Sequence, residues 1–207
     1  VMAIVFYSAP MSSATPVAWA LAELGVPHQS VKFDLSKGDQ KKPEFLALNP
    51  NGKVPTLVVD GTPMFEAVAI MQWLGDRYGV EKKLWPSTQD PQRLQALSWT
   101  TWSYVTFGNN LRGILTATSE QLGPSFHNAA QAEYYRKEVA GLLGMLDARV
   151  AQKGFLLSDQ FSLADLIVSS VIGWASMNNI SLEAHPNVKS WLARCQDRPS
   201  FRASWSA

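Results

Sequence analysis

The chain has 207 residues, of which 46% are hydrophobic, and its 18 basic and 17 acidic side chains leave a net charge of +1. This length allows one large domain or two modest ones, each with its own hydrophobic core. A charge this close to zero provides no overall attraction for nucleic acid or for an anionic membrane, so we expect neither as a partner.

Cys195 is the only cysteine in the sequence, which excludes an internal disulfide and a zinc site built from several cysteines. The three histidines are scattered without metal-ligand spacing, so we expect no metal. No targeting segment is recognisable, and no window reaches the ~18 uninterrupted apolar residues that a membrane-spanning helix needs. Together with the low cysteine usage, which suits a reducing cytosol, these features predict a cytoplasmic protein.

The chain opens with a strand signal followed by a helix signal. The run AIVFY at 3–7 is short, apolar and rich in β-branched and aromatic residues, which predicts a buried strand. Residues 16–25 predict a helix, because Pro16 suits a first helical position and Gly25 supplies a stop.

Further signals predict a strand over 28–35, a short helical turn within 41–52, a hairpin over 56–65 with Asp60-Gly61 at its tip, and an amphipathic helix over 66–79. The order is therefore β-α-β-α-β-β-α. Parallel strands need a helical crossover, and a hairpin adds an antiparallel edge. We therefore expect an α/β domain with a four-stranded mixed sheet.

The second half of the chain carries helix signals and no convincing strand. Residues 80–90 are charged and polar and contain Pro86, which is typical of a linker. Beyond them the pattern predicts helices at 91–118, 126–152, 162–178 and 186–196, followed by a tail after Pro199. The predicted domains are therefore 1–79, a linker at 80–90, and an all-α bundle over 91–207.

The stretch NPNGKVPTLV at 49–58 is the most specific in the first domain. Pro55 directly precedes a strand, and an X-Pro bond at such a turn is a candidate for the cis isomer. A bend there would leave the Val54 N–H and C=O free to pair with a peptide-like ligand. The alternative is an ordinary trans proline at a strand start, which the residues alone favour.

Glu66 and Ala67 lie where the last helix of the first domain begins. The free N–H groups of a helix N-terminus suit a ligand carboxylate, and Glu66 could hold a ligand ammonium. The alternative is an acidic first-turn residue that only complements the helix dipole.

An aromatic set follows the linker in LSWTTWSYVTF: Trp99, Trp102, Tyr104 and Phe107. Such residues are usually core, but a helix facing a cleft can offer some of them to an apolar substrate.

Taken together, these pieces resemble the glutathione transferase family over essentially the whole chain, in its bacterial, serine-type, phi- or beta-like form. The matching motifs are YSAPMSSATPV, GDQKKPEFLALNPNGKVPTLV, MFEAVAIMQWL and FSLADL. The resemblance implies a thioredoxin-like first domain, a helical second domain, a homodimer, glutathione as cosubstrate, and a cis bond before Pro55.

In serine-type members of that family, a hydroxyl in the turn before the first helix donates a hydrogen bond to the glutathione sulfur. The resemblance places this role on Ser12, then on Ser13, and then on Tyr7 as the tyrosine-type alternative. It implies a glutathione site made of Gln40, Lys41, Lys53, Val54, Pro55, Glu66 and Ala67. Candidates for the electrophile site are Met11 and the aromatic set.

The resemblance implies transfer of glutathione to a small apolar electrophile, as in detoxification. A glutathione-dependent isomerase, ether-cleaving enzyme or dehalogenase is an alternative. Ala67 departs from the family pattern, which usually has serine after the glutamate. This departure favours a third reading, a non-catalytic adaptor or ligand-binding protein.

Overall fold

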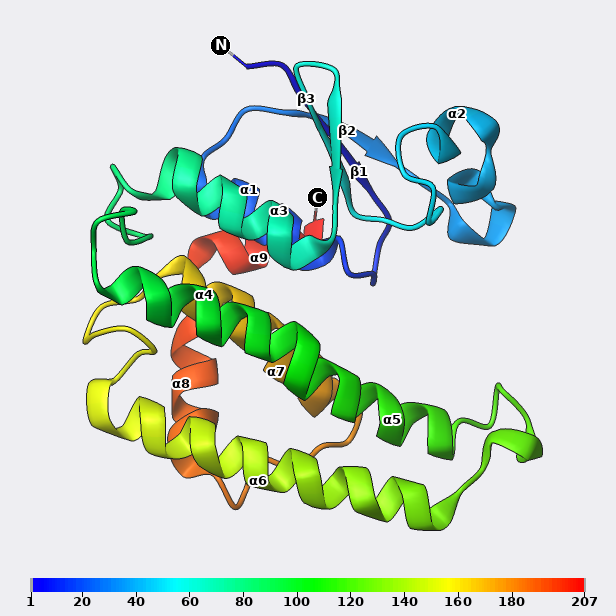
Figure 1. Cartoon of the computed structure of the whole chain (residues 1–207), viewed down its shortest axis with the longest axis vertical. Coiled ribbons are helices and arrows are strands. Elements are labelled where there is room, and N and C mark those ends of the chain that lie inside the picture. The colour runs from blue at the N-terminus through cyan, green and yellow to red at the C-terminus, as the bar shows by residue number, and fades with distance from the viewer. Residues whose placement is uncertain (1, 207) are drawn as a thin grey trace. The chain divides into compact units, whose positions relative to one another are not determined.

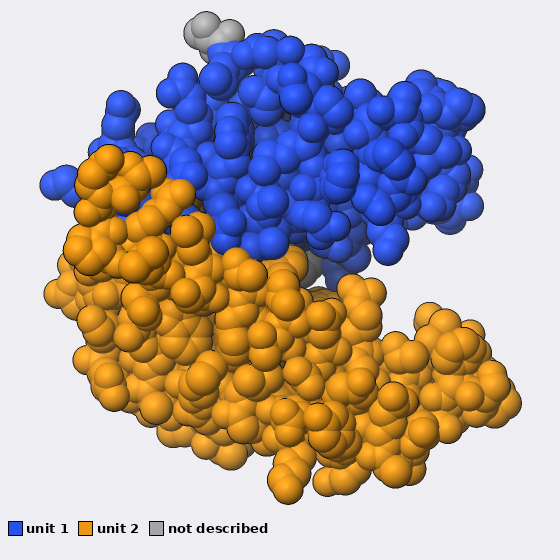
Figure 2. All heavy atoms as spheres, in the orientation of Figure 1, with its two compact units in different colours: residues 1–87, 197–207 blue, residues 88–196 orange. Residues whose placement is uncertain are grey.

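The computed structural model describes residues 2–206 (Figure 1). The chain forms two compact units, shown in different colours in Figure 2. Residues 1–87 and 197–207 make the first unit, and residues 88–196 make the second. Within the described residues, no helix is both long enough and apolar enough to cross a membrane.

The first unit contains the predicted four-stranded mixed sheet. Its strands are β1 (Ile4–Ser8), β2 (Gln29–Lys32), β3 (Thr56–Val59) and β4 (Thr62–Phe65), in the order β2-β1-β3-β4. The β1–β2 pair is parallel and the other two pairs are antiparallel. Asp60 and Gly61 have φ values of 47° and 83°, as a two-residue hairpin requires. The predicted element order and sheet type are confirmed.

Helices α1 (Thr15–Leu24) and α3 (Ala67–Leu74) pack together on one side of this sheet (Figure 1). Their shared core includes Val17, Leu21 and Ile70, which are at most 1% exposed. Helix α1 ends at Leu24, and the predicted stop, Gly25, is its C-cap with a left-handed φ of 60°. Helix α3 continues as a π-helical turn over Gly75–Gly79, and α2 (Pro43–Leu46) is a single short helix before β3.

The tail expected after Pro199 is a helix, α9 (Pro199–Ser206), and it packs against α1 (Figure 1). The ring of Trp19 meets the ring of Phe201 edge to face at 4.9 Å, and its Nε1 donates to Ser200 Oγ at 3.0 Å. Residues 197–207 therefore belong to the first unit, whereas the sequence grouped them with the helical bundle.

The segment between the two halves is partly packed into the first unit. Residues 80–91 form no helix or strand, as expected of a linker. However, Trp85 is only 3% exposed, and its Nε1 donates to Asp76 Oδ1 at 2.7 Å. A Cβ at Gly75 would lie 2.7 Å from the Trp85 ring, so glycine is what admits the indole there. The limits of 1–79 and 91–207 for the functional domains stay a prediction.

The described part of the second unit is all helical. It contains α4 (Gln92–Trp102), α5 (Gly108–Thr118), α6 (Ala129–Lys153), α7 (Leu163–Met177) and α8 (Pro186–Gln196). The single helix expected over 91–118 is interrupted by a π-helical turn at Ser103–Phe107. Thr100 and Ser103 hydroxyls donate to backbone carbonyls of this region, Thr100 to Ala96 O at 2.7 Å and Ser103 to Thr100 O at 2.8 Å. Such bonds compete with the helical ladder.

Helix α7 forms the centre of the second unit, as its nearly continuous apolar sequence predicts. Asp165 in its first turn is 0% exposed and accepts hydrogen bonds from the N–H and O–H of Ser162, the N–H of Leu156 and Nε1 of Trp191. Burial nevertheless raises the pKa of Asp165 above its usual value.

Candidate functional site

Three segments that the sequence singled out meet at one edge of the sheet. Tyr7 on β1 pairs with Thr56 on β3, and Thr56 pairs with Phe65 on β4. Because β3 runs antiparallel to both neighbours, its start lies beside the ends of β1 and β4. The turn that follows β1, the Val54-Pro55 bend and Glu66 therefore emerge from the same edge. We call this place the Val54 edge.

The Val54-Pro55 peptide bond is cis, which confirms the expectation from the resemblance. Val54 is only 8% exposed. In the part of the chain that the structure describes, no hydrogen bond uses the backbone N–H or C=O of Val54. A ligand with a peptide backbone can therefore pair with Val54 without breaking an existing bond.

Asn49 holds the loop that leads to this bend, a role that the sequence analysis missed. Asn49 is 2% exposed, and its Nδ2 donates to Lys53 O at 2.8 Å and to Thr56 Oγ1 at 3.0 Å. Its Oδ1 accepts from the Asn51 N–H at 3.1 Å. The signal for such a role is an asparagine before proline in a turn, since its amide can replace missing backbone bonds.

Gln40 and Lys41 lie against the same loop. Gly52 has a φ of 57°, and a Cβ there would lie 2.8 Å from Lys41 Nζ and 2.9 Å from Gln40 O. Lys41 Nζ also reaches Asn51 O at 3.5 Å. Gln40 Nε2 donates to Leu35 O at 3.4 Å, while its Oε1 is buried without a partner among the described residues. Gln40 and Lys41 thus lie beside Gly52, which precedes Val54 by two positions in the chain.

At the start of α3, Glu66 is exposed and adopts φ 75° and ψ 113°, a conformation uncommon for a residue with a side chain. Ala67 is 4% exposed. The first N–H groups of any helix lack intrahelical partners, so this end of α3 presents donors beside an exposed carboxylate. A group carrying both an ammonium and a carboxylate matches that pair.

The turn at residues 9–14, which we call the hydroxyl turn, explains why serines collect before α1. Ser12 Oγ donates to Ala9 O at 2.6 Å and accepts from the Ala14 N–H at 3.1 Å. Ser13 is exposed, and its hydroxyl has no hydrogen-bond partner within residues 2–206. Thr15 is the first residue of α1, and the N-cap position is occupied by Ala14, whose methyl side chain cannot accept a capping hydrogen bond. Ser12 thus shapes the turn and leaves the helix end itself uncapped by a side chain.

The other candidates near this turn differ in environment. Tyr7 lies in β1, where its ring packs against Phe33 and Phe45 with centroid distances of 5.6 Å and 5.4 Å. Met11 has a φ of 52° and is 71% exposed. Tyr7 is therefore part of an aromatic cluster, whereas Met11 presents its side chain to solvent.

The aromatic set of the second unit is only partly available to a ligand. Trp99 and Trp102 contact each other edge to face at 5.2 Å, and Tyr104 is half-buried. Trp102 also lines a hollow of about 460 Å³ along α4. Phe107 is 0% exposed and packs against Trp102 at 5.7 Å, so it serves the core.

No group of three His, Cys, Asp or Glu side chains that could hold a metal ion exists among residues 2–206.

Comparison with known proteins identifies the family. The N-terminal domain of glutathione S-transferase matches residues 11–77, and its C-terminal domain matches residues 112–199. The glutathione S-transferase hmp2 of Hypomyces subiculosus is 30% identical over 210 residues, covering 97% of this chain and 96% of that protein. The chain belongs to the glutathione S-transferase family.

Two further matches of this glutathione S-transferase family member are a bacterial relative and a solved structure. The glutathione S-transferase GstB of Escherichia coli strain K12 is 29% identical over 188 residues, which are 90% of this chain and 89% of that protein. The crystal structure of the glutathione transferase URE2P6 from Phanerochaete chrysosporium, in complex with oxidized glutathione, superposes with a TM-score of 0.86. That structure is 23% identical and covers 98% of this chain and 94% of its own, so it shows a shared fold.

Proposed function

We propose that this protein binds glutathione at the Val54 edge and activates its thiol for transfer to a small apolar electrophile. The observation that carries the proposal is the meeting of the hydroxyl turn, the unpaired backbone of Val54 and Glu66 at one sheet edge. Each of the three offers a group that one part of glutathione requires.

The proposed placement follows the chemistry of the tripeptide. The cysteinyl backbone pairs with the N–H and C=O of Val54, beside Lys53 and Pro55. The γ-glutamyl ammonium meets the exposed carboxylate of Glu66, and its carboxylate meets the N–H groups of α3 that begin at Ala67. The glycine carboxylate meets Gln40 and Lys41, which supply an amide and a positive charge.

A hydroxyl of the turn then stabilises the thiolate. Lowering a thiol pKa from ~8.5 by two units requires ~2.7 kcal/mol in favour of the charged form. A hydrogen bond to a charged group supplies ~1.5–3 kcal/mol, and a nearby helix N-terminus adds ~0.3–1 kcal/mol. One hydroxyl and the start of α1 together suffice. The sulfur then bonds to the electrophilic carbon as the leaving group departs with its electron pair.

Ser12 is our first candidate for this hydroxyl. Its oxygen already accepts from the Ala14 N–H, which polarises its O–H bond. To donate to sulfur it must exchange the neutral Ala9 carbonyl for a charged acceptor, and such charge-assisted bonds are about twice as strong. Ser13 is the alternative because its hydroxyl needs no such exchange. Tyr7 comes third, since its ring is packed among other aromatics.

We propose Met11, Trp99, Trp102 and Tyr104 as residues that meet the electrophile, because they remain at least partly accessible. Phe107 is left out of this group because it is fully buried. We further propose that the protein acts as a cytoplasmic homodimer in detoxification. Isomerisation, ether cleavage or dehalogenation would use the same thiolate with a different electrophile.

A second candidate function, a non-catalytic adaptor or ligand-binding protein, is favoured by Ala67. A serine hydroxyl at this position would add a hydrogen bond to the γ-glutamyl carboxylate, a bond that alanine cannot make. Its absence lowers the expected affinity for glutathione by about tenfold, or ~1.5 kcal/mol.

Calorimetry with glutathione, combined with conjugation of a chlorinated nitrobenzene, separates these functions. We expect glutathione to bind and the conjugate to form with release of chloride. Binding without conjugation of any electrophile tested would support the adaptor. Absence of glutathione binding at millimolar concentration would contradict the proposal as a whole.

A further inference from the structure

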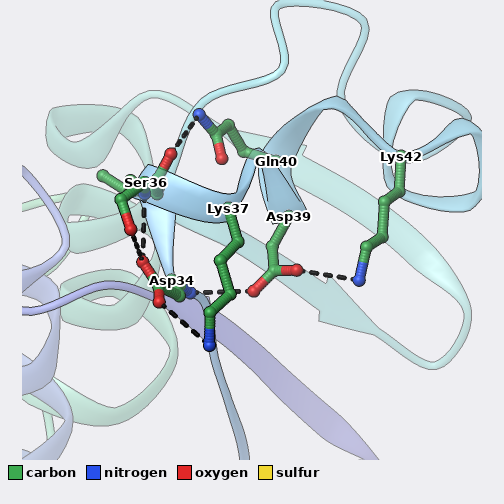
Figure 3. A network of polar contacts seen from close by, with 7 residues as sticks. Asp34, Ser36, Lys37, Asp39, Gln40 and Lys42 are labelled. Atoms are coloured by element: carbon green, nitrogen blue, oxygen red, sulfur yellow. Dashed lines mark hydrogen bonds and ion pairs between the residues drawn. The ribbon is translucent and has the colours of Figure 1, made fainter.

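A compact network of charged side chains organises the segment that carries Gln40 and Lys41 (Figure 3). Asp39 Oδ2 accepts a hydrogen bond from the backbone N–H of Asp34 at 2.9 Å, and Asp39 Oδ1 pairs with Lys42 Nζ at 2.8 Å. Asp39 therefore links Asp34, five positions earlier in the chain, to Lys42, three positions later. The side chain of Asp39 is 21% exposed, whereas that of Lys42 is 56% exposed.

A second carboxylate fixes the beginning of the same segment. Asp34 Oδ1 accepts from the Ser36 N–H at 3.0 Å and from the Ser36 hydroxyl at 2.6 Å, and Asp34 Oδ2 pairs with Lys37 Nζ at 3.4 Å. Gly38, with a φ of 73°, joins the two 3₁₀ turns Leu35–Lys37 and Asp39–Lys41. The two aspartates thus each hold one turn of the segment.

The network also sorts the charges of the segment. Its two carboxylates are taken by Lys37 and Lys42, and Lys41 makes no ion pair with any described residue. Hydrogen bonds from Lys42 and from the Asp34 N–H hold the pKa of Asp39 below its usual value, so Asp39 stays charged at neutral pH. The positive charge of Lys41 consequently remains available, next to Gly52, for an anion that comes from outside the chain.

We propose that Asp39 is a positioning residue for the glycine end of glutathione. By holding Asp34 and Lys42, it keeps Gln40 and Lys41 against the loop before Val54 and leaves Lys41 unpaired for the glycine carboxylate. This inference rests on the proposed function, because it assigns a task to a residue beside the same ligand site.

Calorimetry of the whole chain tests the inference with two ligands, glutathione and its glycine monoethyl ester, in which that carboxylate is masked. We expect Asp39→Ala to raise the Kd for glutathione by about three- to fivefold, the size of effect that surface ion pairs have, and to change the Kd for the ester less than twofold. Asp39→Asn keeps an acceptor for the Asp34 N–H but loses the charge that holds Lys42. We expect the Kd of Asp39→Asn for glutathione to lie between the values of the wild type and of Asp39→Ala.

Asp197→Ala is the matched control, since Asp197 forms an exposed ion pair with Arg202 in the same unit at 2.9 Å. We expect it to change neither affinity. If the wild type binds glutathione but Asp39→Ala and Asp39→Asn weaken both ligands equally, or weaken neither, the inference is wrong and the proposed function stands. If the wild type does not bind glutathione at all, both the proposed function and the inference are wrong.

Discussion

The side-chain amide of Asn49 donates to Lys53 O at 2.8 Å, across the loop that enters the Val54-Pro55 bend. The same amide donates to the buried hydroxyl of Thr56, so one residue joins the loop to the first residue of β3. The backbone of Val54 owes its position to this link between the two ends of a turn.

We expect Asn49→Ala to lower the free energy of unfolding by about 2–3 kcal/mol, because it removes the hydrogen bonds that the buried amide of Asn49 donates to Lys53 O and to Thr56 Oγ1. Urea unfolding measures this change. Asn51→Ala is the comparison, since Asn51 is exposed and its amide donates to Asn49 Oδ1 at 3.1 Å, and we expect it to cost less than ~1 kcal/mol. Equal effects of the two substitutions would contradict the role given to Asn49.

The two serines of the hydroxyl turn are expected to behave differently. Ser12→Ala should reduce the rate of conjugation at least about tenfold, through loss of a hydrogen bond to the thiolate, and should destabilise the fold by ~1 kcal/mol. Ser13→Ala should change the unfolding free energy by less than ~0.5 kcal/mol, because Ser13 is exposed. Steady-state kinetics and thermal unfolding of both variants test this expectation.

The pH dependence of the conjugation rate distinguishes thiol activation from a structural effect. If Ser12 stabilises the thiolate, the kinetic pKa of bound glutathione rises toward ~8.5 in Ser12→Ala. An unchanged pKa in Ser12→Ala together with a raised pKa in Ser13→Ala would transfer the role to Ser13.

Ala67→Ser should tighten glutathione binding by up to about tenfold, because it supplies a hydroxyl donor to the γ-glutamyl carboxylate. Calorimetry measures the Kd. Ala69→Ser, two positions further along α3 and half-buried, is the control and should leave the Kd unchanged. No gain from Ala67→Ser would argue against placing the γ-glutamyl group at this helix end.

The contact between α1 and α9 predicts a pH-dependent contribution to stability. Burial alone would raise the pKa of Glu23, but hydrogen bonds from Arg198 and Ser200 and the charge of Arg198 outweigh it and hold the pKa below its usual value. The side chain of Glu23 is 6% exposed. We expect Glu23→Gln to lower the unfolding free energy by ~1–3 kcal/mol at pH 7, the range for hydrogen bonds to a charged group.

The sign of the pH effect follows from the direction of that shift. Because the pKa of Glu23 is lower in the folded than in the unfolded chain, its contribution is complete above the unfolded value of ~4.3. This stabilising contribution is lost as the pH falls through the lowered pKa of the folded state. The difference in unfolding free energy between the wild type and Glu23→Gln should therefore narrow there. Urea unfolding from pH 7 to pH 3 measures the gap. Glu183→Gln, which removes the exposed pair with Lys189, should have a small effect throughout.

Local signals in the sequence predicted most of the secondary structure. Gly25 and the Asp60-Gly61 tip adopt the positive φ values that such residues favour, so a helix end and a hairpin were correctly placed. The apolar runs predicted the order of strands and helices along the chain, whereas the strand order within the sheet came from the structure. The cis bond before Pro55 came from the family resemblance, since the residues alone favoured the trans form.

The amino-acid sequence by itself thus determined the element order, the mixed sheet and the positions along the chain of the residues at the Val54 edge. Only the tertiary structure decided which candidate residues have free groups. The Ser12 hydroxyl donates to Ala9 O, Phe107 is buried, and Lys41 makes no ion pair with a described residue, whereas Lys37 and Lys42 each pair with an aspartate. The structure also showed that the expected tail after Pro199 is a helix, α9, which packs against α1. The reason is physical: backbone preferences act over a few neighbouring residues, whereas a hydrogen-bond partner or a packing surface is supplied by whichever distant segment the fold brings alongside.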